Sequence, residues 1–352
     1  MTRRFVILTE GHSNPITAKT AACVIRYRPA EVVALLDSTQ RGQTSRELLG
    51  VGQVPVISSL EEVPDANHLL IGIAAPGGRI PPAWRSIILS AIQRGIHVVS
   101  GMHEFLADDP EFSRAAQQQN VKLWDVRNNR QQHIARGLGL REACLRILTV
   151  GHDCSCGKMV TAVEVSGALK RRGVDAKFGA TGQTGIIVEG DGYPIDCMVA
   201  DFVSGAAEQL VLDHQHHEVL LIEGQGSLAH PSFSGVTLSL LHGSQPHALI
   251  LCYEAGRTAM HNLEHVPLPP LSKFKEWNEV LGGIGRPCPV IGISMNSRRL
   301  SSEAAEDERR RVRDEFGLPV CDVFRHGPDE LAEAVLQLWQ ARCTTGSLPE
   351  RA

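Results

Sequence analysis

The sequence predicts an α/β protein of two domains, each built on a mainly parallel β-sheet. Three observations predict this fold class. The chain has 352 residues, more than one hydrophobic core usually organises. Short apolar runs alternate with longer helix-like stretches in both halves, which is typical of βαβ units. A glycine-rich loop stands between a strand and a helix at the start of the second half.

The first half reads as strands joined by helices. Strands are expected at 5–8, 31–37, 54–57, 68–73 and 97–100, and helices at about 17–27 and 82–94. Asp37 closes the second strand, where a dinucleotide fold has its ribose-binding acid, but no GxGxxG follows the first strand. We therefore expect Asp37 to be a strand-end loop residue. Residues 1–140 are predicted to form a Rossmann-like domain.

A polar and then glycine-containing stretch at about 128–141 separates the halves, so residues 141–352 are expected to form the second domain. Its strands are expected at 146–150, 174–178, 218–223, 247–252 and 289–294. Its helices are expected at about 157–172, 301–316 and 329–341.

The loop after the first strand of this half reads Gly151-His152-Asp153-Cys154-Ser155-Cys156-Gly157-Lys158-Met159. A strand, a glycine-rich loop and a Gly-Lys pair at a helix start wrap backbone N–H groups around a phosphate, and the lysine adds a positive charge. The sequence thus predicts a P-loop NTPase-like domain. The residues expected to bind the cofactor's phosphates are Gly151, Asp153, Cys154, Ser155, Cys156, Gly157, Lys158 and Met159.

Met159 departs from the usual P-loop pattern. Nucleotide hydrolases have Ser or Thr after the lysine, and its hydroxyl binds Mg²⁺. A thioether does not ligate this hard cation, and Thr161 should lie on a different face of the helix. The loop therefore favours a diphosphate that is held but not cleaved. No metal site is expected, because the histidines at 214, 216 and 217 read as a solvated turn.

Two further strand-end loops carry polar side chains. Glu223 closes the apolar run 219–222, the position of an acid that acts beside a P-loop. A glycine-rich loop at 179–185 offers the neutral hydrogen-bonding groups of Thr181, Gln183 and Thr184. These loops are candidates for the place where chemistry occurs.

The loops together resemble the DgcN-like family, long known as a domain of unknown function with a P-loop fold. The matching blocks are 151–159, 179–185, 201–208, 222–228, 230–231, 234–238 and 241–244. The methionine after the lysine agrees with the family pattern. His152 and Cys156 depart from it, because threonine and valine are usual there. The long loop, with an acid two residues after its first glycine, is also similar to that of dethiobiotin synthetase.

The resemblance implies an enzyme, an N-acetyltransferase that moves acetyl from acetyl-CoA to the amine of a D-amino acid, D-glutamate being expected. It also implies a metabolic partner, a racemase or epimerase of the enolase type. Such a reaction needs a base, an oxyanion site and cations for substrate carboxylates. We expect Glu223 to be the base, with His230 and Asp153 as the other catalytic candidates, and N–H groups at 224–227 to form the oxyanion site. Asn296 is expected to contact the adenine. The substrate-binding candidates are Thr181, Gln183, Thr184, Asp201, Ser204, Gln225, Ser227 and Arg257.

Two other functions stay open. The first is an ATP- and Mg²⁺-dependent carboxylate-activating ligase or kinase similar to dethiobiotin synthetase, against which Met159 argues. The second is a non-catalytic nucleotide sensor, against which the pairing of Glu223 with His230 argues.

Composition limits the partners. The net charge is −4, the pI is about 6.4 and aromatic residues make up only 5%, so neither nucleic acid nor a membrane is expected as a partner. The nine cysteines contain no CxxC pair and several lie in apolar runs, as reduced thiols of a cytoplasmic protein do. We expect a cytoplasmic homo-oligomer that acts on a small molecule.

Overall fold

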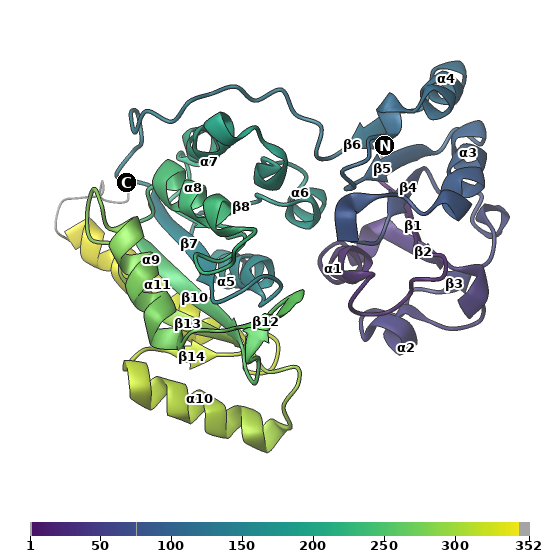
Figure 1. Cartoon of the computed structure of the whole chain (residues 1–352). Helices are drawn as coiled ribbons and strands as arrows, with labels where there is room; N and C mark the ends of the chain where they lie inside the picture. The colour runs from purple at the N-terminus through teal and green to yellow at the C-terminus, as the bar shows by residue number, and fades with distance from the viewer. Residues whose placement is uncertain (1, 75, 345–352) are drawn as a thin grey trace. The chain divides into compact units, whose positions relative to one another are not determined.

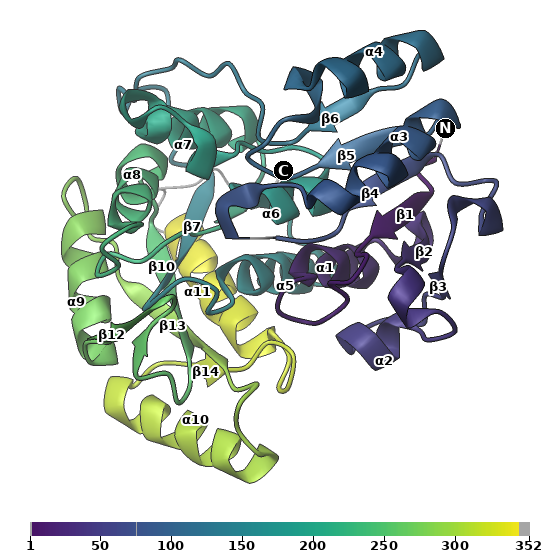
Figure 2. The same cartoon turned by 45° about the vertical axis from the view of Figure 1, so that its right-hand side comes forward.

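The computed structural model describes residues 2–74 and 76–344 (Figures 1 and 2). The chain divides into two compact units. Unit 1 comprises Met1–Asn129 and Ile186–Cys197, and unit 2 comprises Arg130–Gly185 and Met198–Ala352. The division at 129/130 and the boundary expected at 140/141 both lie between the last strand of the first sheet and the first strand of the second.

Unit 1 contains a six-stranded sheet in the order β3-β2-β1-β4-β5-β6. Every neighbouring pair of strands is parallel, as expected for a Rossmann-like unit. The strands are β1 (Phe5–Leu8), β2 (Val32–Leu36), β3 (Val56–Ile57), β4 (His68–Ile71), β5 (His97–Ser100) and β6 (Leu123–Asp125).

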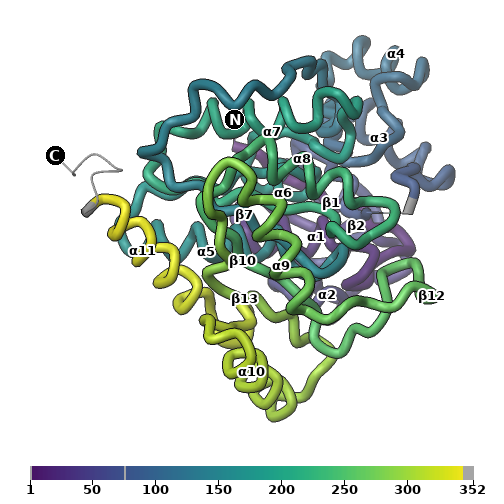
Figure 3. The backbone as a smooth tube through the Cα atoms, turned by 60° about the vertical axis from the view of Figure 1, so that its left-hand side comes forward, coloured from purple at the N-terminus to yellow at the C-terminus, as the bar shows by residue number. Residues whose placement is uncertain are grey.

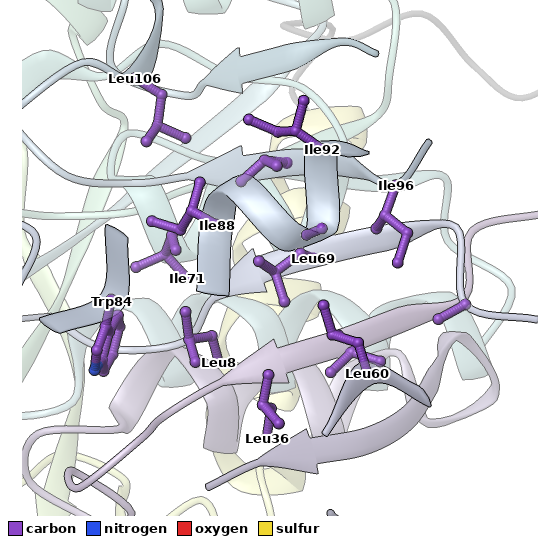
Figure 4. Close-up of a cluster of buried hydrophobic side chains, with 14 of the residues drawn as sticks. Leu8, Leu36, Leu60, Leu69, Ile71, Trp84, Ile88, Ile92, Ile96 and Leu106 are labelled. Carbon is purple, nitrogen blue, oxygen red and sulfur yellow. The ribbon is translucent and has the colours of Figure 1, made fainter. Parts of the chain in front are cut away.

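Helices cover both faces of this sheet, so its strands are apolar on both sides. Leu8 and Ile71 lie in one buried cluster with Trp84 and Ile88, at the start of the third helix (Figure 4). Ile7 points the other way, toward the first helix, where Gly72 leaves room for it. The helices are α1 (Lys19–Tyr27), α2 (Ser45–Leu49), α3 (Arg85–Gln93) and α4 (Pro110–Gln119).

Asp37 is buried after β2, and its carboxylate accepts hydrogen bonds from the N–H groups of Gly11 (3.1 Å) and Thr39 (3.1 Å). It thereby fixes the loop after β1 and its own turn, in keeping with a strand-end loop role. Short 3-10 helices in this unit cover Pro29–Glu31, Ser38–Gln40, Leu60–Glu62, Pro76–Gly78, Pro82–Trp84, Leu106–Asp108 and Ile195–Cys197.

Unit 2 contains a second six-stranded parallel sheet, in the order β14-β13-β10-β7-β9-β8. Its strands are β7 (Leu145–Gly151), β8 (Ala176–Gly179), β9 (Val219–Ile222), β10 (Ala248–Glu254), β13 (Val290–Asn296) and β14 (Val320–Cys321). A separate antiparallel pair follows β10: β11 (Ala259–Met260) and β12 (Leu263–Pro267).

Helices flank this sheet as well (Figure 3). On one face α5 (Lys158–Arg171) contacts β7, β8 and β9, and it packs against α11 (Asp329–Thr344). A layer of α7 (Ala200–His214), α8 (Ser234–Ser244) and α9 (Leu271–Gly282) contacts β8, β7 and β10. The remaining helices are α6 (Gln183–Glu189) and α10 (Ser302–Phe316), which packs against β14. Among the described residues, no helix is long and apolar enough to span a bilayer.

Candidate active site

The parallel sheet of unit 2 brings five loops to one edge. Gly151 at the end of β7 pairs with Cys252, and Glu254 at the end of β10 pairs with Asn296 at the end of β13. On the other side of β7, Ile222 at the end of β9 pairs with Gly179 of β8. The carboxyl ends of parallel strands are where such folds bind ligands. The P-loop after β7 is central in this row.

The P-loop adopts the backbone conformation that turns successive N–H groups toward an anion. Ser155 (φ 53°) and Gly157 (φ 111°) both have positive φ, and Lys158 begins helix α5. The buried Lys158 Nζ donates to the carbonyl oxygen of Asp153 (2.7 Å), which positions the ammonium group across the loop. This geometry fits the phosphate-binding role expected of residues 151–158.

His152, which departs from the family pattern, is a buried neutral residue. Its Nε2 accepts a hydrogen bond from the N–H of Glu254 (3.0 Å), and its ring packs edge-on against Tyr253 and Phe274. Burial lowers the pKa of His152 to about 3. The side chain therefore joins the P-loop to the end of β10 and does not add charge to the site.

Asp153 is fully buried at the base of the loop. Oδ2 accepts from Arg257 Nη1 (2.7 Å) and from the N–H of His261 (2.7 Å), and Oδ1 accepts from the N–H of Cys154 (2.7 Å). Burial alone would raise the pKa of Asp153, but these hydrogen bonds outweigh it and hold the pKa below its usual value. Asp153 is thus an ionised group that orders the loop.

Arg257 follows β10 and lies between two buried carboxylates. Besides Asp153, it binds the carbonyl oxygen of Cys154 (2.7 Å) through Nη1 and the carboxylate of Glu254 through Nη2. Its side chain is only 5% exposed. Its expected role as a clamp for a substrate carboxylate stays a prediction.

Glu223 ends β9 on the other side of the P-loop. Its Oε2 accepts hydrogen bonds from the N–H groups of Thr181 (2.9 Å) and Gly182 (3.1 Å). Glu223 is only 6% exposed. Gln225 Nε2 binds Thr181 Oγ1 (3.1 Å), so the loops after β8 and β9 form one structure. The sequence-predicted residues Thr181, Glu223 and Gln225 are therefore in contact.

Gly224 allows β9 to approach the P-loop closely. A Cβ at this position would lie 1.6 Å from the carbonyl oxygen of Thr149 and 3.1 Å from Cδ of Lys158. The N–H of Gly224 donates to Thr149 Oγ1 (2.9 Å). The expectation that this N–H contributes to an oxyanion site is therefore wrong, because a neighbouring strand uses it.

Ser227 and His230 follow β9, as Glu223 does. Ser227 Oγ donates to the carbonyl oxygen of His152 (2.9 Å). His230 is buried, and its Nδ1 accepts from the N–H of Ser232 (3.2 Å). Ligand atoms of Asp153, Cys154 and His230 lie within 4.8 Å of one another. Arg257 already neutralises Asp153 in this group, which disfavours a second cation there.

Thr161 does not replace the missing P-loop hydroxyl. Its Oγ1 lies 2.7 Å from Ser294 Oγ, in a buried contact with β13. The helical spacing predicted that Thr161 lies on a different face of the helix from the residue after Lys158, and the structure shows that its hydroxyl faces the sheet.

Other predicted residues lie outside this network. Asp201 and Ser204 belong to helix α7, and Asp201 is exposed. Among the described hydrogen bonds and ion pairs, neither side chain contacts the P-loop or the loops after β8 and β9. Gln183 and Thr184 begin helix α6, and the buried Oε1 of Gln183 has no hydrogen-bond partner among the described residues. Asn296 Oδ1 accepts from the N–H of Arg298 (3.2 Å).

Sequence reasoning found Arg257 but missed Glu254, Arg298 and Arg299. Glu254 is 0% exposed, and Arg257, Arg298 and Arg299 all contact its carboxylate. An acid at the end of an apolar strand was the signal that identified Glu223. The same signal stands at the end of β10, in the run 248–254.

The fold and the site define a two-unit α/β protein with a Rossmann-like unit and a P-loop unit that lacks the Mg²⁺-binding hydroxyl. Family models agree with this class. The P-loop domain of unknown function DUF1611_C matches residues 133–332, and the Rossmann-like domain of unknown function DUF1611_N matches residues 38–129. The chain belongs to this DUF1611 family.

Relatives are similar over most of their length. A D-glutamate N-acetyltransferase from Tritonibacter scottomollicae is 38% identical over 324 residues, which cover 91% of this chain and 94% of the relative. A D-glutamate N-acetyltransferase from Pseudoalteromonas sp. is 41% identical over 267 residues, covering 76% and 80%. The crystal structure of a DUF1611 family protein from Anabaena variabilis superimposes with a TM-score of 0.90 at 39% identity, covering 95% of this chain and 99% of the other.

Proposed function

We propose that this protein is an N-acetyltransferase that moves the acetyl group of acetyl-CoA to the amine of a D-amino acid, D-glutamate first among them. The observation that carries the proposal is the juxtaposition of a P-loop without a magnesium hydroxyl and a buried carboxylate, Glu223, on the neighbouring strand end. CoA contains a diphosphate that must be held but not hydrolysed. The names of the two curated relatives support this reaction.

In this proposal the P-loop binds the diphosphate of CoA. The N–H groups of residues 155–158 and the ammonium group of Lys158 supply the positive potential, and Asp153 with Arg257 holds the loop in shape. The N–H groups of His152 and Cys154 are used within the protein, by Cys252 and Asp153. Asn296 lies on the side of the adenine. Met159 leaves the site without the hydroxyl that would bind a metal for phosphoryl transfer.

Glu223 is the proposed general base. It removes a proton from the substrate ammonium group, so that the neutral amine attacks the thioester carbonyl. The new N–C bond forms as the C–S bond breaks, and the released thiolate takes up a proton. The N–H groups of Thr181 and Gly182 fix the carboxylate in place. His230 is the second candidate for this role.

Substrate contacts are proposed for Thr181, Gln183, Thr184, Asp201, Ser204, Gln225, Ser227 and Arg257. The structure gives Gln183 the most specific support, since its buried Oε1 lacks a partner among the described residues and it begins the helix next to the loop that holds Glu223. An ammonium N–H would satisfy this oxygen.

The test is to mix the purified protein with acetyl-CoA or with Mg-ATP and a panel of D- and L-amino acids. Four of the nine cysteines are partly exposed and would react with a thiol reagent. Thioester loss should therefore be followed by ultraviolet absorbance and the N-acetyl product by mass spectrometry. We expect product from D-glutamate, unchanged by EDTA. ADP formation without N-acetyl product would instead support the ligase or kinase alternative.

A Glu223→Gln variant tests the base. It keeps an oxygen for the two N–H donors but does not accept the proton, so we expect kcat to fall about 100-fold or more with little change in KM for acetyl-CoA. Glu208→Gln is a matched control, because Glu208 is a buried carboxylate of the same unit that accepts from the N–H groups of Arg136 and Gly137. Equal losses of kcat in both variants would count against Glu223.

The proposal extends to the setting of the reaction. We propose a cytoplasmic homo-oligomer, since acetyl-CoA is a cytosolic metabolite and none of the nine cysteines, all of which the structure describes, forms a disulfide. An enolase-type racemase would then act on the N-acetyl product. Residues 1–140 and 141–352 are proposed as the Rossmann-like and P-loop domains.

A further inference from the structure

Three arginines converge on one buried carboxylate beside the P-loop. Glu254 Oε2 contacts Arg257 Nη2 and Arg298 Nη2 (2.9 Å), and Oε1 lies 2.6 Å from Nε of Arg299. Arg257 is almost fully buried and shares its charge between Glu254 and Asp153. The side chains of Arg298 and Arg299 are 49% and 57% exposed. Two guanidinium groups are thus held in place with much of their surface open to solvent.

Arg298 and Arg299 lie in the turn at residues 297–300, the arginine turn, which several hydrogen bonds hold in place. Ser297 is buried, and its N–H and hydroxyl both donate to Asp322 Oδ2 (2.9 and 2.6 Å). Asn296 Oδ1 accepts from the N–H of Arg298. The arginines are therefore preorganised, which lowers the conformational entropy lost when they bind a ligand.

Arg325 adds a further cation to this turn. Its guanidinium donates to Ser297 Oγ (3.0 Å), Ser302 Oγ (2.9 Å) and the carbonyl oxygen of Leu300 (3.2 Å). These partners are all neutral, and no carboxylate within the described part of the chain forms an ion pair with it.

The charges of this region do not balance. Lys158 is set aside, because its charge serves the ligand at the P-loop. The other cations are Arg257, Arg298, Arg299 and Arg325, and the carboxylates that contact them or their turn are Asp153, Glu254 and Asp322. Four positive and three negative charges leave an excess of one, on a chain whose net charge is −4. A local positive excess in an acidic protein indicates an anionic ligand beyond the one at the P-loop.

The sheet order places this excess on a defined side of the P-loop. In the row β14-β13-β10-β7-β9-β8, the arginines follow β13 and β10 is between them and β7, whereas Glu223 follows β9. A ligand with its diphosphate at the P-loop thus has the arginine turn on one side and the proposed base on the other. CoA has this polarity, because its diphosphate separates a 3′-phosphorylated adenosine from the arm that ends in the thioester.

We propose that Arg298 and Arg299 bind the 3′-phosphate of CoA and make the site selective for CoA over nucleotides without this group, ATP included. This inference rests on the proposed use of acetyl-CoA. Planar guanidinium groups bind phosphate oxygens through paired N–H donors, and Glu254 orients both of them for this contact.

The test compares CoA with 3′-dephospho-CoA by isothermal titration calorimetry, and their acetyl esters as substrates by steady-state kinetics. For the wild-type protein we expect CoA to bind at least tenfold more tightly. In an Arg298→Ala/Arg299→Ala variant this preference should fall below about threefold, through weaker binding of CoA only. Arg298→Lys/Arg299→Lys keeps the charge and should retain part of the preference.

Arg310→Ala is the matched control, an exposed arginine of helix α10 that pairs with Asp307 and should leave the preference intact. If the double variant melts early, Arg299→Ala alone serves, since Glu254 then keeps two arginines. Equal affinity of the wild type for both ligands would overturn the inference, as would an equal loss for both ligands in the variant. A preserved CoA preference without N-acetyl product from any amino acid would refute the proposed function and leave the phosphate site standing.

Discussion

Arg257→Ala should be the most damaging single change at the site. The arginine side chain is 5% exposed and contacts two carboxylates that are each 0% exposed, Asp153 and Glu254. Removing one partner of a buried ion pair costs about 3–5 kcal/mol, because a charge is left without compensation. Glu254 retains Arg298 and Arg299, so most of the loss should arise at Asp153.

This loss has a measurable size and pH dependence. For a unit of roughly 200 residues, 3–5 kcal/mol corresponds to a fall in Tm of about 6–20 °C. Arg257 holds the pKa of Asp153 below its usual value in the folded protein. A group with a lowered folded pKa stabilises the fold above its unfolded pKa of about 4, and this contribution is lost as the pH falls further. The gap between wild type and variant should therefore narrow below about pH 4.

Urea unfolding at several pH values, in a double-mutant cycle with Asp153→Asn, isolates the pair. In the Asp153→Asn background, Arg257→Ala should lower the free energy of unfolding by about 2 kcal/mol less than in the wild type, because no carboxylate at position 153 is then left without a partner. Arg310→Ala, which removes an exposed ion pair, should cost less than about 1 kcal/mol. If Arg257→Ala costs the same in the Asp153→Asn background as in the wild type, the reasoning is refuted.

Three further variants and one control test the loop and its neighbours. Lys158→Ala should raise KM for acetyl-CoA at least tenfold, since it deletes the buried ammonium group of the loop, and an unchanged KM would show that the loop serves another ligand. Met159→Thr should leave acetyl transfer within about threefold and independent of Mg²⁺ in steady-state assays, and a newly acquired metal requirement would contradict this. Gly224→Ala should give little folded protein by circular dichroism, because its Cβ would meet the Thr149 carbonyl at 1.6 Å. Gly235→Ala, in helix α8 with no atom within 4 Å of a new Cβ, should be neutral or slightly stabilising by about 1 kcal/mol.

The sequence predicted five of the six strands of each sheet, all but the short β6 and β14, and the helices α1, α3, α5, α10 and α11. It did not reveal the layer of α7 and α8. Small residues, not a stripe, join these helices: a Cβ on Gly243 of α8 would lie 2.1 Å from the carbonyl oxygen of Ser204 and 2.8 Å from Cβ of Ala207, both in α7. Helices that pack this closely and are largely buried lack the period of 3.6 residues that sequence analysis detects. Asp201 and Ser204 were assigned to a binding site from the resemblance, and the structure has them in this helical layer.

The sequence predicted some residues of the site and missed others. A strand-end acid predicted Glu223, and a continuous motif predicted the P-loop, since both signals lie within one stretch of sequence. The convergence of Arg298 and Arg299 on Glu254 depends on the pairing of β10 with β13, which joins residues more than 40 positions apart. No local pattern contains that information, so the charge surplus became visible only in the fold.

Met159 and the arginine turn both bear on whether the P-loop binds ATP or CoA. The methionine removes the hydroxyl that a Mg-nucleotide requires, which argues against ATP by what the site lacks. The two half-exposed guanidinium groups argue for CoA by what the site contains, because ATP carries no phosphate at the 3′ position of its ribose. One feature concerns phosphoryl chemistry and the other concerns recognition, so the two arguments are independent. A ligand that carries a 3′-phosphate on its ribose and is not cleaved at its diphosphate meets both conditions.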